Sequence, residues 1–358
     1  MKALRDADQI VDRMPDRERG EAPHARDAEP LEPALLRRRH LARVARRHER
    51  RELRAFAVRN PVADLIRGAE GFHEKWLGRI ADAIAGRRDT LQAIVVAGPS
   101  SSGKTTFIKR LTVQLRVEGI RPVNVSLDDY YVDRARTPRD EAGEHDFEAI
   151  EALDTTLLSA QVRALLAGEP VRAARYDFVA GQSLPAGGPE LAMERGDVLL
   201  IEGIHGLDPG LLHGVVDDAR VFRVFVHPAT ALPFDRLEVV SPEDVRLLRR
   251  IVRDRRGRNY TAAQTIARWP SVRRGELRRI YPHLPRADAV FDTSLVYEPS
   301  VLRTFADRYL LEVDPHDAAF ATAQRLRRLL DAFVAIDADH VPPTSVIREF
   351  IGGSGFEQ

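Results

Sequence analysis

The sequence contains no cysteine, only four lysines among 55 basic residues, and no long hydrophobic run. The lack of cysteine excludes disulfides, thiolate metal sites and a cysteine nucleophile. A membrane-spanning helix needs about 18 or more apolar residues in a row, and neither such a run nor a signal-peptide pattern is present. We therefore expect a cytoplasmic protein that does not enter a membrane.

The charges are nearly balanced, and arginine supplies almost all of the positive ones. The net charge of +1 argues against a generic nucleic-acid binder. In this background an arginine-rich stretch is weak evidence of function, whereas a lysine is more informative because arginine does not replace its compact ammonium group. With 358 residues, 44% of them hydrophobic, the chain is long enough for about two domains, or for one large domain with extensions.

Residues 1–60 differ from the rest of the chain. The first thirty or so mix charged residues and proline with few large apolar side chains, a composition typical of disorder. Residues 35–56 have a helical pattern with many arginines. A solvated helix is the simplest interpretation. The alternative is an arm that binds phosphate or a partner, and it is the one candidate contact with nucleic acid.

From residue 61 onward, helical and buried-strand patterns alternate. An amphipathic helix is predicted over 61–86, and further helices over 104–117, 150–166, 242–256, 261–268 and 318–333. Short apolar runs predict buried strands over 93–97, 122–127, 198–201, 221–226 and 289–291. This order is typical of a parallel α/β sheet with helices on both faces.

Residues 98–105 match the Walker A pattern without a gap. Its glycines let successive backbone N–H groups point at phosphates, Lys104 reaches the β and γ phosphates, and Thr105 offers a hydroxyl to magnesium. The buried strand before the motif and the helix after it supply the required context. The predicted nucleotide-binding residues are Gly98, Ser100, Ser101, Ser102, Gly103, Lys104, Thr105 and Thr106.

Carboxylates follow two of the predicted strands, where ligands bind in open α/β sheets. Asp128 follows the second strand and is placed to act as a base toward an acceptor hydroxyl, with an ordinary turn as the structural alternative. Glu202 follows four apolar residues. A charge there is costly unless it is paired or binds a cation, which favours a role near magnesium over a salt bridge or helix cap.

The segment 246–258 is rich in arginine. The spacing of Arg249, Arg250 and Arg253 puts them on one face of a helix, and Gly257 marks a turn after it. A mobile segment of this kind, closing over a nucleotide, would neutralise phosphoryl charge and exclude water.

Together these motifs resemble the uridine kinase and phosphoribulokinase family of P-loop kinases, from about Phe72 to the C-terminus. The matching motifs are residues 98–106, 126–131, 176–178, 201–206 and the arginines of 249–258. Three further motifs, at 132–138, 269–276 and 347–353, are similar to motifs of a bacterial branch described as uridine kinase-like nucleoside kinases.

The resemblance implies a kinase that uses ATP (or GTP) and Mg²⁺. Asp128 would be the catalytic base, with Lys104 and Arg253 acting on the transferred phosphoryl group. Thr105, Asp128 and Glu202 would hold the metal. The lid arginines at the nucleotide would be Arg250, Arg253 and Arg256, and the acceptor pocket would contain Tyr131, Glu148, Tyr176, Phe178 and Arg258.

The domain plan that we expect is an arm at 1–60, a kinase domain at 61–310 with a lid at about 246–275, and a helical extension at 311–358 packing on it. The 5′-hydroxyl of uridine or cytidine is the first candidate acceptor. Another alcohol or a sugar phosphate is an alternative, as is a nucleotide-dependent regulatory or RNA-associated role. Homo-oligomerisation stays open.

Two smaller observations bear on the acceptor. Uridine kinases carry a base-recognising histidine shortly after the Tyr-x-Phe motif, and Gly181 stands there in this chain. His205 follows Glu202 and is a candidate for contact with phosphate or substrate, whereas His213, His227 and His283 show no ligand spacing.

Overall fold

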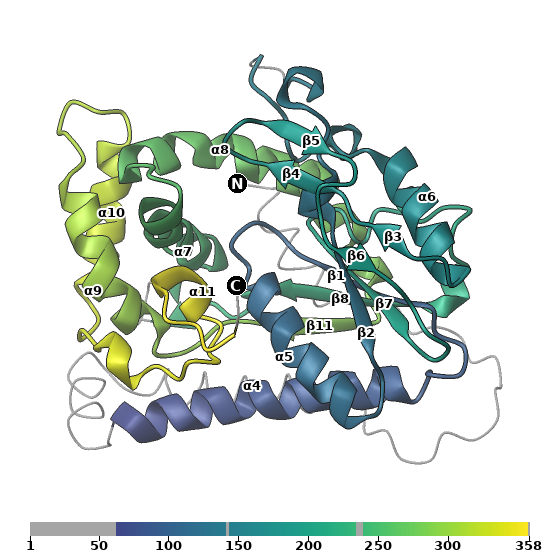
Figure 1. The fold of residues 1–358 in the computed structure, drawn as a ribbon. Helices are drawn as coiled ribbons and strands as arrows, with labels where there is room; N and C mark the ends of the chain where they lie inside the picture. The colour runs from purple at the N-terminus through teal and green to yellow at the C-terminus, as the bar shows by residue number, and fades with distance from the viewer. Residues whose placement is uncertain (1–61, 141–142, 234–238, 357–358) are drawn as a thin grey trace. The chain divides into compact units, whose positions relative to one another are not determined.

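The structure is a computed structural model that describes residues 62–140, 143–233 and 239–356. The arginine-rich arm expected at 1–60 lies outside the described residues. The predicted α/β class is confirmed, because five strands form one parallel sheet in the order β11-β8-β1-β7-β2 (Figure 1). These strands are β1 (Ala93–Ala97), β2 (Pro122–Ser126), β7 (Val198–Glu202), β8 (Val221–His227) and β11 (Ala289–Asp292).

Helices cover both faces of this sheet. Side chains alternate along β1, so that Ile94 and Val96 face α4 (Val62–Ala85) and α5 (Lys104–Val117), while Val95 faces α6 (Thr155–Leu166). All five residues of β1 are buried, as the apolar run predicted. The layered core fixes the carboxyl end of β1, where the Walker A loop begins.

A second group of helices has a hydrophobic core of its own and lies beside the sheet (Figure 1). It consists of α7 (Pro242–Gly257), α8 (Ala262–Arg279), α9 (Glu298–Leu311), α10 (Phe320–Leu330) and the short α11 (Arg348–Ile351). The C-terminal residues share this core with α7, since Leu326, Leu330 and Ile351 pack with Leu248 and Ile251. The region after residue 311 therefore continues the helical layer.

Shorter elements connect these layers. The short antiparallel pairs are β3 (Val171–Arg172) with β6 (Glu190–Leu191), β4 (Arg175–Asp177) with β5 (Gln182–Leu184), and β9 (Leu232–Pro233) with β10 (Val239–Val240). Short 3₁₀ helices span Leu127–Tyr130, Arg134–Arg136, Ile150–Ala152, Asp218–Arg220, Tyr281–Arg286 and Ala338–His340. None of the described helices is both long and apolar enough to cross a membrane.

Two predicted helices have different bounds in the structure. The helix expected from residue 150 begins at Thr155, because the Asp154 side chain accepts a hydrogen bond from the Leu157 N–H and caps it there. The helix expected over 261–268 continues to Arg279 through Pro270. A capping box at Thr261 and Gln264 starts this helix, and burial of Val272 and Glu276 stabilises its second half.

Candidate active site

The Walker A loop winds tightly between β1 and α5. Ser101 and Gly103 have φ angles of 59° and 95°, in the left-handed region that the loop's reversal requires. Gly98 lies against β8, where a Cβ would be 3.0 Å from the Val226 carbonyl carbon. The Lys104 ammonium donates hydrogen bonds to the carbonyls of Gly98 and Pro99, at 2.9 and 3.2 Å. The structure thus brings the predicted residues Gly98–Thr106 together at the carboxyl end of the central strand.

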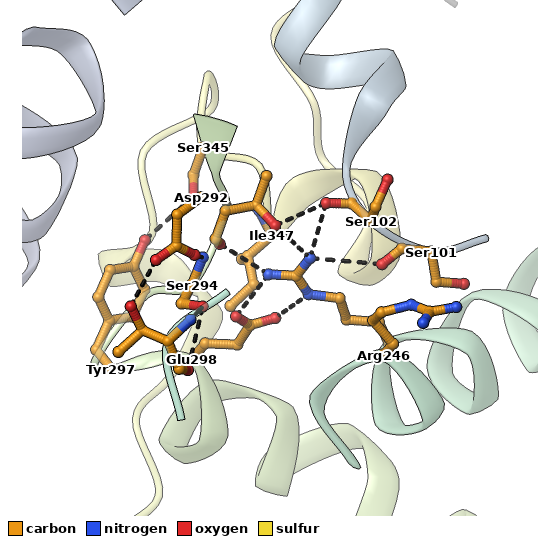
Figure 2. Close-up of polar contacts among 12 residues, drawn as sticks. Ser101, Ser102, Arg246, Asp292, Ser294, Tyr297, Glu298, Ser345 and Ile347 are labelled. Carbon is orange, nitrogen blue, oxygen red and sulfur yellow. Dashed lines mark hydrogen bonds and ion pairs between the residues drawn. The ribbon is translucent and has the colours of Figure 1, made fainter. Parts of the chain in front are cut away.

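Two buried arginines of α7 hold this loop from behind. Arg246 donates to the Ser100 carbonyl at 2.9 Å, and Arg249 donates to the Ser102 carbonyl at 3.1 Å. In Figure 2 the carboxylate of Glu298 and the carbonyls of Ser101 and Ser102 surround one guanidinium, which the hydrogen bonds identify as that of Arg249. This support of the Walker A loop was not predicted from the sequence, because the arginines of α7 were expected to face the nucleotide.

The predicted lid arginines separate into two groups. Arg250, Arg253 and Arg258 gather around the buried carboxylate of Asp254, at 3.3, 2.9 and 3.8 Å. Arg250 also donates to the Ser100 hydroxyl at 2.9 Å, which links this group to the Walker A loop. Arg256 instead lies over the Phe305 ring of α9, 5.8 Å from its centroid.

The helix geometry explains this separation. Asp254 is four positions from both Arg250 and Arg258 and shares a face with them, whereas Arg256 is only two positions from Asp254 and points to another side of the helix. The expected mobile lid begins within α7, and one side of this helix packs in the hydrophobic core. Its buried residues include Leu247, Leu248, Ile251 and Val252. Sequence reasoning also missed Asp254, whose charge makes the clustering of three arginines favourable.

The two predicted carboxylates meet beside the loop. Glu202 ends β7, Ser126 is its partner in register on β2, and the Ser126 hydroxyl donates to Glu202 at 3.1 Å. The pKa of Glu202 is raised to about 7, first by burial and then by the charge of Asp128, while the Lys104 ammonium opposes both effects. Asp128 itself is exposed in the 3₁₀ turn after β2, where an acceptor can approach it.

The donor atoms fit magnesium. Thr105, Asp128 and Glu202 offer only oxygen, which is the ligand type that Mg²⁺ prefers. The charge of Asp128 contributes to the raised pKa of Glu202, so the two carboxylates repel each other, and a divalent cation would relieve that repulsion. These three residues are therefore suited to hold the metal together with phosphate oxygens.

An aromatic cluster lies next to Asp128. The ring of Tyr131 is 5.7 Å from that of Tyr176 and 6.4 Å from that of Phe178, and its hydroxyl donates to the Phe147 carbonyl at 3.2 Å. Burial raises the pKa of Tyr131 well above its ordinary value, and the charges of Asp128 and Glu148 add to the rise. Asp128 and Glu148 thus both lie near this tyrosine.

Glu148 connects the aromatic cluster with the arginines of α7. Burial raises its pKa to about 7, and the nearby Arg250 guanidinium opposes that rise. The backbone of α8 comes so close that a Cβ at Gly275 would be 2.9 Å from the Glu148 Cγ. Gly275 belongs to the motif at 269–276, and this close approach is a physical reason for glycine there.

Arg134 occupies the space next to Gly181. Gly181 has a φ of 71°, and a Cβ there would be 2.7 Å from the Nε and Cζ atoms of Arg134. The Arg134 guanidinium donates to the Phe178 carbonyl at 2.7 Å. Burial raises the pKa of Tyr176, and the positive charge of Arg134 opposes the rise. A positively charged group therefore lies where the resemblance placed a base-recognising side chain.

The histidines lie outside this arrangement of charges. His205 is 2% exposed, and burial lowers its pKa to about 4. Burial also lowers the pKa of His227 to about 4, and its ring lies 5.1 Å from that of Phe225. His283 faces Asp208 at 3.6 Å. His205 and His227 are consequently neutral near pH 7.

Comparisons with known proteins identify the family of this chain. The model of the phosphoribulokinase / uridine kinase family matches residues 93–296, which is more than half of the chain. Uridine kinase-like protein 5 of Arabidopsis thaliana is 34% identical over 169 residues, covering 46% of this chain and 31% of that protein. A uridine kinase of Chloroflexus aurantiacus is 30% identical over 200 residues, covering 55% of this chain and 85% of that protein.

A solved structure, phosphoribulokinase from Rhodobacter spheroides, has a TM-score of 0.37 at 22% identity, covering 56% of this chain and 68% of that one. The span matched by the family model, residues 93–296, includes all five strands of the parallel sheet, the Walker A loop, Asp128 and Glu202. The chain belongs to the phosphoribulokinase / uridine kinase family of P-loop kinases.

Proposed function

We propose that this chain transfers the γ-phosphoryl group of ATP to a hydroxyl of a small molecule, with the 5′-hydroxyl of uridine or cytidine as the first candidate. One observation carries the proposal: the Walker A loop, Asp128 and Glu202 meet at the carboxyl ends of the adjacent strands β1, β2 and β7. A nucleotide-dependent regulator has no need of a carboxylate that faces an aromatic acceptor pocket. Relatives named uridine kinases favour the nucleoside.

Each group of residues has its own role in the proposed reaction. The backbone N–H groups of the loop and Lys104 bind the phosphates, and Asp128 accepts the proton of the attacking hydroxyl. Thr105 and Glu202, with Asp128 beside them, would hold Mg²⁺, which supplies charge neutralisation at the β and γ phosphates when bound. Arg250, Arg253 and Arg258 lie together around Asp254, with Arg250 reaching Ser100 and lying near Glu148. These three arginines would stabilise the charge that develops on the transferred group.

The test is an ATP-consumption assay with a panel of nucleosides, sugars and sugar phosphates. We expect turnover with uridine or cytidine, and Asp128→Asn should lower kcat by about 10²–10⁴-fold because it removes the base. The matched control is Asp129→Asn, which removes the adjacent carboxylate and should keep turnover within about threefold of wild type. ATP binding without turnover of any compound would favour the regulatory role.

A second acceptor class is favoured by Arg134. Its guanidinium lies beside Tyr176 and Phe178, where an anionic group of a substrate would gain a charge-assisted hydrogen bond. An alcohol that already carries a phosphate is therefore the second candidate acceptor. For such a substrate, Arg134→Ala should raise KM about tenfold or more. The control is Arg136→Ala in the same exposed turn, and equal effects of both variants would contradict a specific contact.

A further inference from the structure

The C-terminal segment 345–353 lies against the Walker A loop. The backbone N–H of Thr106 donates a hydrogen bond to the Glu349 carboxylate at 3.0 Å, across 243 residues of sequence. The Val346 side chain fills the space beside Gly103. The Phe350 ring lies under the Arg249 guanidinium, 5.1 Å from centroid to charge, and the same guanidinium binds the carbonyls of Ser101 and Ser102.

The N–H group of Thr106 is a donor that a nucleotide would use. It lies in the first turn of α5, where backbone N–H groups have no partner within the helix. Such groups, together with the helix dipole, form the phosphate-binding end of a Walker A loop. The Glu349 carboxylate is an anion bound at this place, so a phosphate and this side chain compete for one donor.

The backbone around Glu349 is held firmly. Val346, Ile347, Phe350 and Ile351 are at most 3% exposed. The next residue along the chain from Ile347, Arg348, donates to the carbonyls of Ala338 and Val341 at 2.8 and 2.6 Å. Figure 2 shows Tyr297 beside Ser345, whose hydroxyl groups are 3.1 Å apart.

The Glu349 side chain is only partly buried, in contrast to the four apolar residues around it. Turning it away breaks one hydrogen bond, whereas moving the segment would expose four buried apolar side chains. The part of this segment that can yield to a ligand is therefore the side chain alone.

We propose that Glu349 is a further residue of the nucleotide site: its carboxylate takes the Thr106 N–H and must turn away before a phosphate group binds there, so that it sets the affinity for the nucleotide. The inference rests on the proposed function only in that the Walker A loop binds a nucleoside triphosphate. It also gives a physical role to the motif at 347–353, whose apolar residues anchor the backbone and whose glutamate faces the loop.

The experiment is calorimetric titration of the full chain with MgATP and with inorganic tripolyphosphate. Glu349→Gln keeps the size of the side chain and removes its charge, and Glu349→Ala removes the acceptor altogether. Both variants should bind MgATP about tenfold more tightly than wild type, as expected from the loss of one charge-assisted competitor. The affinity for tripolyphosphate should increase by a similar factor, because Glu349 competes with a phosphate group and not with the nucleotide base. Asp331→Asn, which removes a carboxylate paired with Arg303, is the control and should leave both affinities unchanged.

The outcomes distinguish this inference from the proposed function. Unchanged or weaker MgATP binding by both Glu349 variants, with wild-type thermal stability, would overturn the inference and leave the kinase proposal intact. A lower kcat at unchanged KM for ATP would also overturn it, since that pattern indicates a residue that positions the reacting groups. Failure of folded wild type and both variants to bind MgATP would overturn both proposals.

Discussion

Arg249 and Glu298 form an ion pair whose two side chains are completely buried, directly behind the Walker A loop. The same guanidinium donates to the carbonyl of Ser102 at 3.1 Å and to the hydroxyl of Thr293 at 3.0 Å. Most of its donors therefore have partners, which is the condition under which a buried ion pair is tolerated. The loop that binds phosphate is held in shape by a charge that no ligand can reach.

Loss of this pair should destabilise the protein strongly. Glu298→Ala leaves the buried Arg249 charge without its partner, so we expect the free energy of unfolding to fall by about 3–5 kcal/mol. Urea denaturation followed by circular dichroism measures this change. Asp331→Asn, which breaks an exposed pair with Arg303, should cost less than about 1 kcal/mol. A loss for Glu298→Ala as small as that of the control would contradict a structural role for the pair.

Arg250 should matter for the reaction more than its neighbours on α7. It contacts the Ser100 hydroxyl at 2.9 Å and lies near Glu148, between the nucleotide loop and the acceptor pocket. Arg250→Ala should lower kcat by about 10²-fold or more, as expected for a donor that stabilises transition-state charge. Arg255 points elsewhere, toward Glu312 and Tyr309.

The matched control is Arg255→Ala, which should keep kcat within about twofold of wild type. Steady-state kinetics with saturating acceptor separates the two variants. If both lowered kcat equally, the effect would come from the helix as a whole and not from the position of Arg250.

Glu148 should give the stability a pH dependence of defined sign. Burial raises its pKa to about 7, so the folded protein holds this proton at pH values where the unfolded chain has lost it. The contribution of Glu148 to the free energy of unfolding is complete at acidic pH, below the ordinary carboxyl pKa. It decreases as the pH rises through about 7 and changes little above that.

Urea denaturation between pH 5 and pH 8 tests this dependence. The glutamine of Glu148→Gln cannot titrate. The free energy of unfolding of wild type should therefore fall relative to that of the variant as the pH increases. A difference that is constant across this range would show that Glu148 keeps an ordinary pKa in the folded protein.

The sheet and the phosphate loop were predicted closely from local patterns. Each expected strand of the parallel sheet agrees with the structure within one residue, because a buried strand depends mainly on its own run of apolar side chains. The start of α6 was wrong by five residues, since the Asp154 cap outweighed the apolar period before it. The roles of the arginines were harder to predict, because a helix pattern gives the spacing of charges and not the partner on each side.

The sequence by itself determined that this chain has a Walker A loop after a buried strand, and that carboxylates follow two further strands of a parallel sheet. These features need only neighbours along the chain and the periodicity of strands and helices. Tertiary structure decided which side chains complete the site. Arg246 reaches Ser100 across 146 residues, Glu349 reaches Thr106 across 243, and Arg134 lies over Gly181. Such contacts depend on how separate layers pack, and packing is a property of the whole fold and not of any one segment.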